Sequence, residues 1–470
     1  MSDPVRPPSL TDARGLGGII AQDGFDYQLW DGLARLPPWL ANPTFEQMLF
    51  EGLEDLEARF FAPYAPQQHL LERYQAKSGM LGAKEIADVF ASFKAFEDAY
   101  PRHTRLFTLV TPQLASSLRW IGRDPKRVRK ARPFYAPFPA VVDASDVKLR
   151  ADLDGQFGSS GAFVANFVEI SERVLPDRDS AVQAFGFAFS RSFPDLALAP
   201  RIVERSFEDL SAFARKNIGV PLKRQDIVHV LEEATGVSLF SASAFPLLMR
   251  SDRKESDERY LEIDASAFSG GENGYPPADV WKSELATPLL LTAQWLRASG
   301  INRVTVAGSY RLSTAMVLGW AFRAATGFEL ELPTRDGAWA TDDRPTANDA
   351  PPSWQVNQPT ASAVDNLVVT IGVLRDPIQA LPTSLTEGGV LSLFLAEPVT
   401  SARMAQQSVA LIKKTISEAA GKAKAKKLLL YFAGPAVLAA ALGHRWNAMP
   451  PTQLHEFIIA TRNYVPTARL

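Results

Sequence analysis

The amino-acid sequence predicts an α/β protein with more than one folded region. The chain is 470 residues long, which exceeds what one hydrophobic core usually serves, so we expect two or three domains. Hydrophobic residues make up 46% of the chain and charged residues 22%, which is the balance of an ordinary globular protein. Near the start and again after about residue 260, strand-like apolar runs alternate with helical patterns. This alternation predicts helices packed on sheets, with parallel strands in the later region.

The first α/β block is expected over about residues 17–112. Its hydrophobic runs follow the order helix, strand, strand, helix and strand. The two central strands are predicted at residues 48–61 and 70–78, and the next helix and strand at 84–99 and 106–111. Such an order is typical of an α/β domain.

The middle stretch, residues 113–225, carries a basic run followed by amphipathic segments. The segments 162–175 and 207–216 show helical periodicity, so this part is predicted to be mostly helical. We assign residues 1–225 to one domain with a helical extension, and residues 226–470 to a second domain.

The second domain is expected to contain one structural unit used twice, in halves of about residues 226–345 and 364–470. Residues 338–363 are rich in Pro, Asp, Asn and Thr and are predicted to form a long loop between the halves. Each half has a helix, a strand, a glycine, a helix and a strand in that order. The matching segments are 288–299, 303–307, Gly308, the helix with Leu318-Gly319-Trp320 and 328–332, then 402–419, 427–432, Gly434, the helix with Leu442-Gly443-His444 and 454–459.

Composition excludes several kinds of site. The chain has no cysteine, which excludes disulfides, thiolate zinc sites, iron–sulfur clusters and cysteine nucleophiles, and which fits the cytosol best. Its five histidines form no HExxH or similar spacing, so a metal would have to be held by carboxylates. The net charge of -2 means that any DNA contact must come from a local basic surface.

Neither a signal peptide nor a membrane span is predicted. The first residues are polar and proline-rich and have no hydrophobic signal core. The longest apolar stretch, residues 428–443, is interrupted by Gly434 and Pro435, which favours a strand, a turn and a buried helix. We therefore expect a cytoplasmic protein without a membrane partner.

Two predicted strands carry a candidate catalytic site. The first contains Glu51 and Asp55, and the second contains Gln75 and Lys77. Because side chains alternate along a strand, Gln75 and Lys77 project from one face. If the two strands are neighbours, a carboxylate, an amide oxygen and an ammonium group converge. Oxygen ligands suit Mg²⁺ or another divalent metal that activates water for phosphodiester hydrolysis, while lysine orients this water or neutralises charge on the phosphate.

The same pattern also has a purely structural interpretation, because alternating Gln, Lys, Glu and Asp is what the solvent-facing side of a sheet normally shows. A longer pattern favours the catalytic interpretation. It consists of Gly17-Gly-Ile-Ile-Ala-Gln22-Asp-Gly24-Phe25-Asp-Tyr27-Gln28, followed by Gly-Leu-Glu-Asp55 and by Gln75-Ala-Lys77. This pattern resembles the PD-(D/E)xK nuclease domains that serve as antiviral effectors.

The resemblance implies a restriction-endonuclease-like fold and a role for each matching residue. Asp55 and Gln75 correspond to metal ligands and Lys77 to the catalytic lysine, while Glu51 and Gln22 are candidates that complete the site. Gln75 departs from the acidic residue that is usual at its position, although its amide carbonyl still offers an oxygen to a metal.

A basic cluster lies within residues 119–132, directly after the first block. A DNA backbone is attracted to such a cluster whatever the base sequence, although a solvated helix face would look the same. The residues assigned to DNA contact are Arg123, Lys126, Arg127, Arg129, Lys130 and Arg132. A second basic run, over residues 422–427, is interpreted as lysines that suit the end of a helix.

Several segments of the second domain carry a further resemblance. They are 304–313, Leu318-Gly319, 428–435, Leu442-Gly443 and Tyr464-Val-Pro466. They resemble the SAVED domain, a fused pair of CARF-like Rossmannoid folds that binds cyclic oligonucleotides in bacterial CBASS antiphage systems.

A ligand pocket is expected where the strands of the second domain end. In a parallel sheet, a glycine at the carboxyl end of a strand lets backbone N–H groups and the next helix N-terminus approach a phosphate. Arg311 adds a guanidinium group and Trp339 a stacking surface, although the glycines also have the plain interpretation of helix-entry residues. Strands predicted at 366–373 and 390–396 direct further turns to the pocket. The predicted ligand contacts are Gly308, Ser309, Arg311, Leu312, Trp339, Gly372, Val373, Pro398, Phe432, Gly434, Pro435 and Tyr464.

Together these features predict an antiphage effector. A cyclic di- or trinucleotide binds the SAVED domain, ligand-bound molecules self-associate, and the nuclease domain degrades double-stranded DNA with Mg²⁺. One alternative is a non-catalytic cyclic-nucleotide receptor that binds DNA or a protein partner through a degenerate nuclease fold. Another is a nuclease that answers a CRISPR-derived ring nucleotide.

Overall fold

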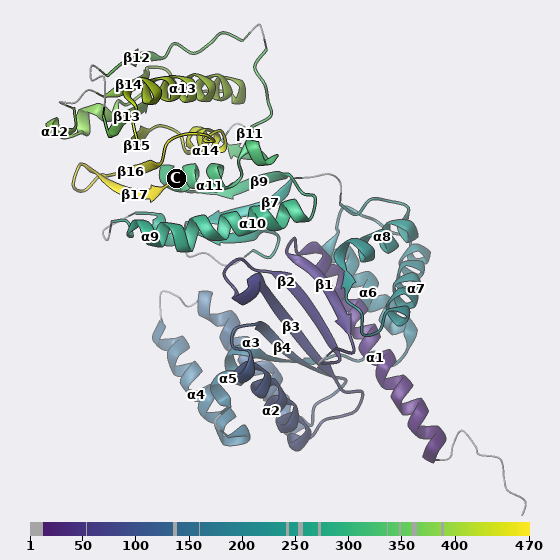
Figure 1. Cartoon of the computed structure of the whole chain (residues 1–470). Coiled ribbons are helices and arrows are strands. Elements are labelled where there is room, and N and C mark those ends of the chain that lie inside the picture. The colour runs from purple at the N-terminus through teal and green to yellow at the C-terminus, as the bar shows by residue number, and fades with distance from the viewer. Residues whose placement is uncertain are drawn as a thin grey trace, which may run out of the picture. The chain divides into compact units, whose positions relative to one another are not determined.

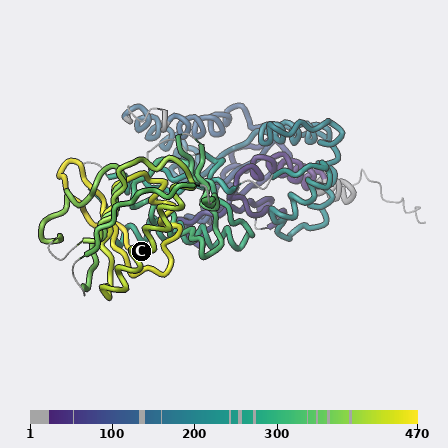
Figure 2. Tube along the Cα trace, turned by 90° about the horizontal axis from the view of Figure 1, so that it is seen from above, coloured from purple at the N-terminus to yellow at the C-terminus, as the bar shows by residue number. Residues whose placement is uncertain are grey.

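The computed structural model of the chain consists of two compact units, Met1–Ser241 and Ala242–Leu470. It describes residues 13–52, 54–134, 139–158, 160–240, 244–251, 257–270, 274–335, 337–346, 349–359, 364–386 and 390–470, except for the side chains of 13–22, 132–134 and 139. Figures 1 and 2 follow the chain in two views, from purple at the N-terminus to yellow at the C-terminus. Both units contain helices packed on mixed sheets, so the predicted α/β class is confirmed.

The described residues of the first unit form a six-stranded sheet in the order β5-β4-β3-β2-β1-β6. β1, β2 and β3 are antiparallel neighbours, β4 and β5 continue parallel to β3, and β6 closes the other edge. The strands are β1 (Phe45–Phe50), β2 (Leu56–Phe61), β3 (His69–Ala76), β4 (Thr104–Thr111), β5 (Val168–Glu172) and β6 (Leu222–Lys223). β3 therefore stands where the antiparallel part of the sheet meets the parallel part.

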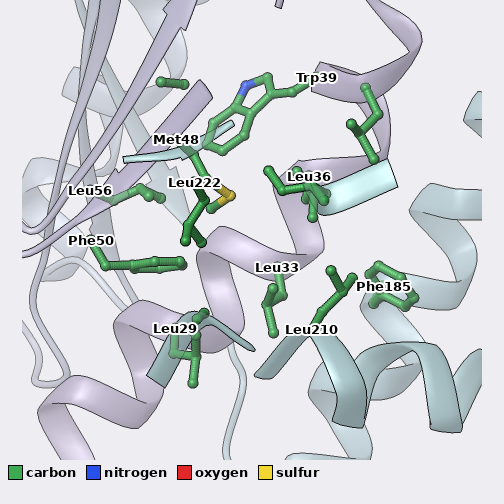
Figure 3. Close-up of a cluster of buried hydrophobic side chains, with 14 of the residues drawn as sticks. Leu29, Leu33, Leu36, Trp39, Met48, Phe50, Leu56, Phe185, Leu210 and Leu222 are labelled. Atoms are coloured by element: carbon green, nitrogen blue, oxygen red, sulfur yellow. The ribbon is translucent and has the colours of Figure 1, made fainter. Parts of the chain in front are cut away.

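Helices cover both faces of this sheet (Figure 1). One face carries α1 (Ala13–Ala41), α6 (Arg178–Ser192), α7 (Pro200–Lys216) and α8 (Arg224–Thr235), and the other carries α2 (Ala83–Ala99), α3 (Arg119–Phe134), α4 (Pro139–Phe157) and α5 (Gly161–Phe167). Short helical turns are η1 (Pro66–Gln68) and η2 (Ser116–Leu118). Figure 3 shows the first core, in which Leu29, Leu33 and Trp39 of α1 pack among side chains of the strands and of α6 and α7. Burial of these large apolar side chains fixes α1 over the sheet.

Three details of the first unit differ from the sequence-based prediction. Residues 48–61 do not form one strand, because a turn at residues 51–55 folds them into the hairpin of β1 and β2. Residues 162–175 are only partly helical, since their second half forms β5, whose apolar residues pair with β4 at the edge of the sheet. The division between the compact units lies beyond residue 225, because Ile227 and Leu231 of α8 belong to the first core.

The second unit has two sheets built on the same plan. Their strand orders in the described residues are β11-β10-β9-β7-β8 and β12-β14-β13-β15-β16-β17. The central strands of each sheet are parallel, and β11, β12 and β17 are antiparallel edge strands. Apart from the additional β12, each strand of one sheet has a counterpart at the same place in the other. The predicted pair of related α/β halves is confirmed.

The elements of the first half are β7 (Phe245–Arg250), β8 (Leu261–Asp264), η3 (Ser266–Phe268), α9 (Ala278–Trp281), η4 (Lys282–Ala286), α10 (Thr287–Ala298), β9 (Arg303–Gly308), α11 (Leu312–Ala321), η5 (Ala324–Thr326), β10 (Glu329–Thr334) and β11 (Gly337–Ala340). Those of the second half are β12 (Gln355–Asn357), β13 (Asn366–Val373), η6 (Pro377–Ala380), α12 (Thr383–Thr386), β14 (Leu391–Leu395), α13 (Ala402–Ala423), β15 (Lys427–Ala433), α14 (Ala436–His444), β16 (Thr452–Ile458) and β17 (Asn463–Arg469). The stretch predicted as one long loop thus contains the edge strands β11 and β12.

The two halves meet through α11 and α14, whose backbones touch at a pair of glycines. A Cβ atom on Gly319 would lie 2.0 Å from the carbonyl oxygen of Ala440, and one on Gly443 would lie 2.2 Å from that of Met316. The contact is reciprocal, so the helices are related by an approximate twofold axis. Only glycine allows backbones to approach this closely.

This reciprocal contact also corrects the predicted alignment of the halves. The shift in residue number that takes Gly319 to Gly443 also takes the first residue of β9 to that of β15. Under this shift, Gly308 corresponds to Phe432 rather than to Gly434. The similar Ala-Gly pairs in the sequence are therefore not structurally equivalent.

Candidate functional site

The candidate catalytic residues of the first unit meet at one end of β2 and β3. These two strands are antiparallel neighbours, with Leu56 opposite Tyr74. Asp55 is in the turn directly before β2, and its Oδ2 accepts a hydrogen bond of 2.7 Å from the backbone N–H of Ala76. Lys77 follows β3 directly, and its backbone N–H donates to the carbonyl oxygen of Val110 at 2.8 Å. The condition that the two segments be neighbours is therefore met.

Gln75 links an acid and a base within this group. With its amide oriented to satisfy both neighbours, its nitrogen donates to Oε2 of Glu54 at 3.2 Å and its oxygen accepts from Nζ of Lys77 at 3.2 Å. The sequence-based prediction did not include Glu54. The sequence did contain a feature that could have identified Glu54: it directly precedes Asp55, so the two residues share one turn.

Gln28 of α1 is a second residue that the prediction missed. Its side chain donates a hydrogen bond to Asp55, and its Oε1 is buried without a hydrogen-bond partner. Gln28 closes the amino-terminal pattern of the sequence, which was the available signal. Gln22 is also in α1, but its side chain lies outside the described residues. Glu51 is exposed at the start of the turn, with a φ of 53°.

Burial dominates the electrostatics of the three acids in the turn. It raises the pKa of Asp55, while the Ala76 N–H group and the Lys77 charge act in the opposite direction. Burial also raises the pKa of Glu54 to about 7, against the effect of Arg73. Burial and the charge of Asp55 raise the pKa of Glu51. Such shifts mean that these carboxylates would gain from a nearby cation.

The residues at this edge fit a magnesium ion with a small number of protein ligands. Among the residues that the structure describes, no group of three or more His, Asp or Glu side chains could hold a metal ion. Asp55 and Glu54 nevertheless offer two carboxylates, and the unpartnered Oε1 of Gln28 offers a neutral oxygen. Mg²⁺ is typically held by one or two carboxylates and keeps several waters, so this donor set suits it.

The predicted DNA-contacting residues lie on α3. Arg123, Lys126, Arg127 and Lys130 are exposed, and their spacing places them along one side of the helix. Arg129 has a different role, because its guanidinium donates to the carbonyl oxygens of Ala165 and Val168 at 2.9 and 3.1 Å. The side chain of Arg132 lies outside the described residues. The basic surface is thus narrower than the basic segment of the sequence.

In the second unit, Gly308, Ser309 and Arg311 follow one another at the carboxyl end of β9. Gly308 has a φ of 98°, and a Cβ atom there would lie 2.2 Å from the carbonyl oxygen of Met249, so neighbouring β7 already requires glycine. The hydroxyls of Ser309 and Ser251 are 2.9 Å apart. The exposed Arg311 donates from Nε to the carbonyl oxygen of Ser269 at 2.6 Å. These polar groups lie directly before the N-terminus of α11.

The N-terminus of α11 already has an anionic partner. The carboxylate of Glu456, from β16 of the other half, accepts a hydrogen bond of 2.5 Å from the backbone N–H of Ser313 and another from that of Leu312. Glu456 is only 5% exposed. Burial raises its pKa, although these hydrogen bonds and the charge of Arg311 oppose the shift. The expectation that this helix end is open to a phosphate is not met, because Glu456 occupies it.

The predicted contacts of the second half gather at the carboxyl ends of β13 and β15. Gly372 and Val373 end β13, and a Cβ atom on Gly434 would lie 3.3 Å from Cγ2 of Val373. Pro435 is the N-cap residue of α14. A Cβ on Gly372 would lie 2.4 Å from the carbonyl oxygen of Arg375, so the chain turns tightly here. The carboxyl ends of β13 and β15 therefore bring together Gly372, Val373, Gly434 and Pro435.

The remaining predicted ligand contacts lie in several different parts of the second unit. Leu312 and Phe432 line a small cavity between α11 and β15. Tyr464 lies on β17, where its ring packs edge-on to Tyr431 with centroids 5.2 Å apart. Trp339 pairs with Leu332 on the edge strand β11, and Pro398 is exposed beyond β14. The structure therefore does not gather all twelve residues into one enclosed pocket.

A family model matches the C-terminal part of the chain. It is the SAVED family, described as the "SMODS-associated and fused to various effectors sensor domain", and it matches residues 291–470. The match includes β9 to β17, and so the predicted SAVED resemblance is confirmed. Among the residues that the structure describes, no helix has the length and apolar character to cross a membrane.

Similar proteins cover nearly the whole chain. The CD-NTase-associated protein 4 of Moraxella osloensis is 25% identical over 475 residues, which cover 98% of this chain and 99% of that protein. A protein of the same name from Acinetobacter sp. is 25% identical over 476 residues with the same coverage. The solved Acinetobacter baumannii Cap4 SAVED/CARF-domain containing receptor with the cyclic trinucleotide 3'3'3'-cAAA has a TM-score of 0.77 and 22% identity, covering 95% of this chain and 98% of that one. The Moraxella osloensis receptor has a TM-score of 0.73 and 22% identity, covering 96% and 100%. The fold is therefore shared along the chain.

Proposed function

We propose that this protein, which carries a SAVED domain at its C-terminus, is a cytoplasmic CBASS antiphage effector whose first unit cleaves double-stranded DNA when the second unit binds a cyclic oligonucleotide. The observation that carries the proposal is that Asp55, Gln75 and Lys77 meet at the adjoining ends of β2 and β3. The same chain also contains a SAVED domain. A sensor joined to a candidate hydrolytic site has the organisation of a ligand-controlled enzyme.

A cyclic trinucleotide is the proposed ligand. Similar receptors have been solved with 3'3'3'-cAAA and 2'3'3'-cAAA, at 22% identity and a TM-score of 0.77, which supports this ligand class. In this chain, Arg311 offers an exposed guanidinium for a phosphate or base, and the turns at Gly372 and Gly434 let backbone groups approach the ring. Trp339, Tyr464 and the other predicted contacts remain part of the proposal.

The chemistry of the first unit is proposed to be phosphodiester hydrolysis. A bound Mg²⁺ would supply a water of lowered pKa and would neutralise charge on a phosphate oxygen. Asp55 is oriented for metal binding, because the N–H of Ala76 and the side chain of Gln28 hold its carboxylate. The Lys77 ammonium, held by Gln75, would stabilise the charge that develops on the phosphate. Glu51 stays a candidate for completing the site.

DNA would be held by the exposed side of α3. Arg123, Lys126, Arg127 and Lys130 can contact phosphates without reading base sequence. We expect Lys126→Ala/Lys130→Ala to weaken DNA binding uniformly across sequences and to flatten its salt dependence by roughly one to two units of the log–log slope. Fluorescence anisotropy at several salt concentrations measures this.

Ligand would activate the enzyme through self-association. If bound SAVED domains pack together better than free ones, the ligand shifts the population toward an assembly through its differential affinity. Sedimentation velocity with and without ligand tests this step. An unchanged sedimentation coefficient at saturating ligand would contradict it.

The central experiment incubates plasmid DNA and Mg²⁺ with each member of a panel of cyclic di- and trinucleotides. We expect cleavage with one ligand only. Asp55→Ala and Lys77→Ala should each lower the rate by at least about a hundredfold while ligand affinity, measured by calorimetry, stays unchanged. Asp88→Ala, which removes an exposed carboxylate on α2, is the matched control. Ligand binding without any cleavage would favour the non-catalytic receptor instead.

A further inference from the structure

The two glutamines at the candidate catalytic site have opposite environments. Both ends of the Gln75 amide are engaged, by Oε2 of Glu54 and by Nζ of Lys77, each at 3.2 Å. Gln28 uses its nitrogen toward Asp55 and keeps a buried Oε1 without a hydrogen-bond partner. A buried acceptor without a partner has a free-energy cost that a ligand can remove.

An amide oxygen that already accepts from an ammonium group is a poor metal ligand. Lys77 and a divalent cation would compete for the same oxygen of Gln75, and their positive charges would repel each other. The free oxygen of Gln28 has no such competitor, and it lies on the side chain that already contacts Asp55.

We propose that Gln28 presents the amide oxygen to the cation at Asp55, and that Gln75 is a positioning residue that holds Glu54 and Lys77 in place. This inference rests on the proposed function. It reverses the role that the nuclease resemblance assigns to Gln75, and it adds Glu54 as the second carboxylate of the site. Gln28 of α1 and Glu54 of the turn before β2 thus complete the site around Asp55.

The neutral amide at position 75 has a physical reason in this arrangement. A carboxylate there could pair with Lys77 but would face the carboxylate of Glu54 without a proton to donate. An amide can donate to the acid and accept from the base at the same time. Gln75 therefore holds the side chains of Glu54 and Lys77 apart while contacting both.

The test compares two matched variants of the full chain, Gln28→Leu and Gln75→Leu. Binding of Mn²⁺ alone is measured by the free-ion signal in electron paramagnetic resonance, and ligand-activated plasmid cleavage is measured separately. Gln113→Leu, which changes an exposed glutamine beyond β4, is the control. If circular dichroism shows that a leucine variant is unfolded, Gln28→Met and Gln75→Met replace the pair.

We expect Gln28→Leu to weaken Mn²⁺ binding by about tenfold or more, and Gln28→Glu, which keeps an oxygen donor, to restore it. Gln75→Leu should leave Mn²⁺ affinity within about threefold of wild type while lowering the cleavage rate at saturating metal by at least about tenfold. Glu54→Gln should weaken Mn²⁺ binding as Gln28→Leu does.

The reverse pattern would overturn the inference: Mn²⁺ affinity that depends on Gln75 and not on Gln28. The proposed function fails differently. If the wild type and Asp55→Asn bind Mn²⁺ equally, or if the wild type does not bind it, the metal-dependent site itself is wrong. Wild-type binding that is lost in Asp55→Asn but kept in Gln28→Leu overturns only the role of Gln28.

Discussion

The two halves of the second unit share one plan but differ at the same helix end. In both, a helix follows the central strand and packs against its counterpart through a glycine. The N-terminus of α11 is capped by the carboxylate of Glu456, which comes from β16. The residue of β10 at the corresponding position is Leu332, which is buried and apolar, so α14 has no equivalent carboxylate. The two halves therefore share one arrangement of strands and helices, and they differ in single residues at equivalent positions.

Corresponding faces of the two sheets of the second unit differ as well. Strands β9 and β10 carry an ion-pair network in which Arg303 binds Glu329 and Glu331, each at 2.8 Å. The matching face of the other sheet carries Tyr431 and His455, whose rings stack with centroids 4.2 Å apart. The ion-pair network is partly solvated, whereas Tyr431 is buried in an apolar cluster with residues of η6 and α12. Equivalent positions of the two halves therefore differ in their chemistry on this face too.

The largest expected effect comes from breaking what the halves share. Gly319→Ala places a Cβ atom against backbone atoms of α14, which cannot move aside as a flexible side chain could. We expect the free energy of unfolding to fall by about 3 kcal/mol or more. Gly443→Ala should cost a similar amount, because the contact is reciprocal. Urea denaturation measures both.

Gly421→Ala in α13 is the matched control for these variants. No heavy atom lies within 4 Å of the added Cβ position, so alanine should stabilise the helix by about 0.5 to 1 kcal/mol. Equal losses in all three variants would mean that the backbone contact between α11 and α14 is not what makes glycine necessary.

A smaller effect is expected from removing the carboxylate of Glu456, which caps α11 but has no counterpart at the equivalent position next to α14. Glu456→Ala leaves the buried N–H group of Ser313 without its acceptor, and should lower the free energy of unfolding by about 2 kcal/mol. Glu418→Ala, at an exposed position of α13, should change it by less than about 0.5 kcal/mol. A loss no greater than this control would show that the cap has no energetic role.

Because Glu456 is a titratable group, its contribution to the free energy of unfolding depends on pH. Burial raises the pKa of this carboxyl above its ordinary value of 4.5, so the folded state binds its proton more tightly than the unfolded state. The contribution of this group to stability therefore falls as the pH rises from 4.5 through the raised pKa. Glu456→Gln should make the free energy of unfolding less steep over that range. An unchanged slope would contradict the shift.

The smallest effect is expected from the ion pairs of Arg303, on the five-stranded sheet of the second unit. Arg303→Ala removes a half-exposed ion-pair network and should lower the free energy of unfolding by less than about 1 kcal/mol. The loss should shrink further at high salt, because the charges are partly solvated. Denaturation at low and high ionic strength measures this. A large loss that salt does not change would mean that Arg303 acts through packing.

Sequence reasoning was most successful where periodicity was long and regular. Helix α13 and strand β13 lie where the pattern predicts them, because α13 has a regular helical period and β13 is one uninterrupted apolar run. The hairpin of β1 and β2 was missed, since Glu51, Glu54 and Asp55 near its turn also suit the surface of a strand. The equivalence of Gly319 and Gly443 could not be read from their neighbours, because it depends on how two distant helices touch.

The candidate site shows the same division. Asp55, Gln75 and Lys77 were predicted from their order and spacing, and the structure brings them together. Glu54 and Gln28 were not predicted, because their contacts come from the shape of a turn and from the docking of α1 on the sheet. Arg129 was assigned to DNA, yet its guanidinium holds the carbonyl oxygens of Ala165 and Val168. A list of charged residues does not say which of them already have partners.

By itself, the sequence determined the α/β class, the repeated order of strands and helices, and the chemical types at the candidate site. These follow from local periodicity and from residue chemistry, which neighbours along the chain encode. Only the tertiary structure decided which amide has a free oxygen, which helix end has a carboxylate, and which cations face solvent. Those properties depend on contacts between segments far apart in the chain, and a hydrogen bond forms with whichever partner folding brings within reach.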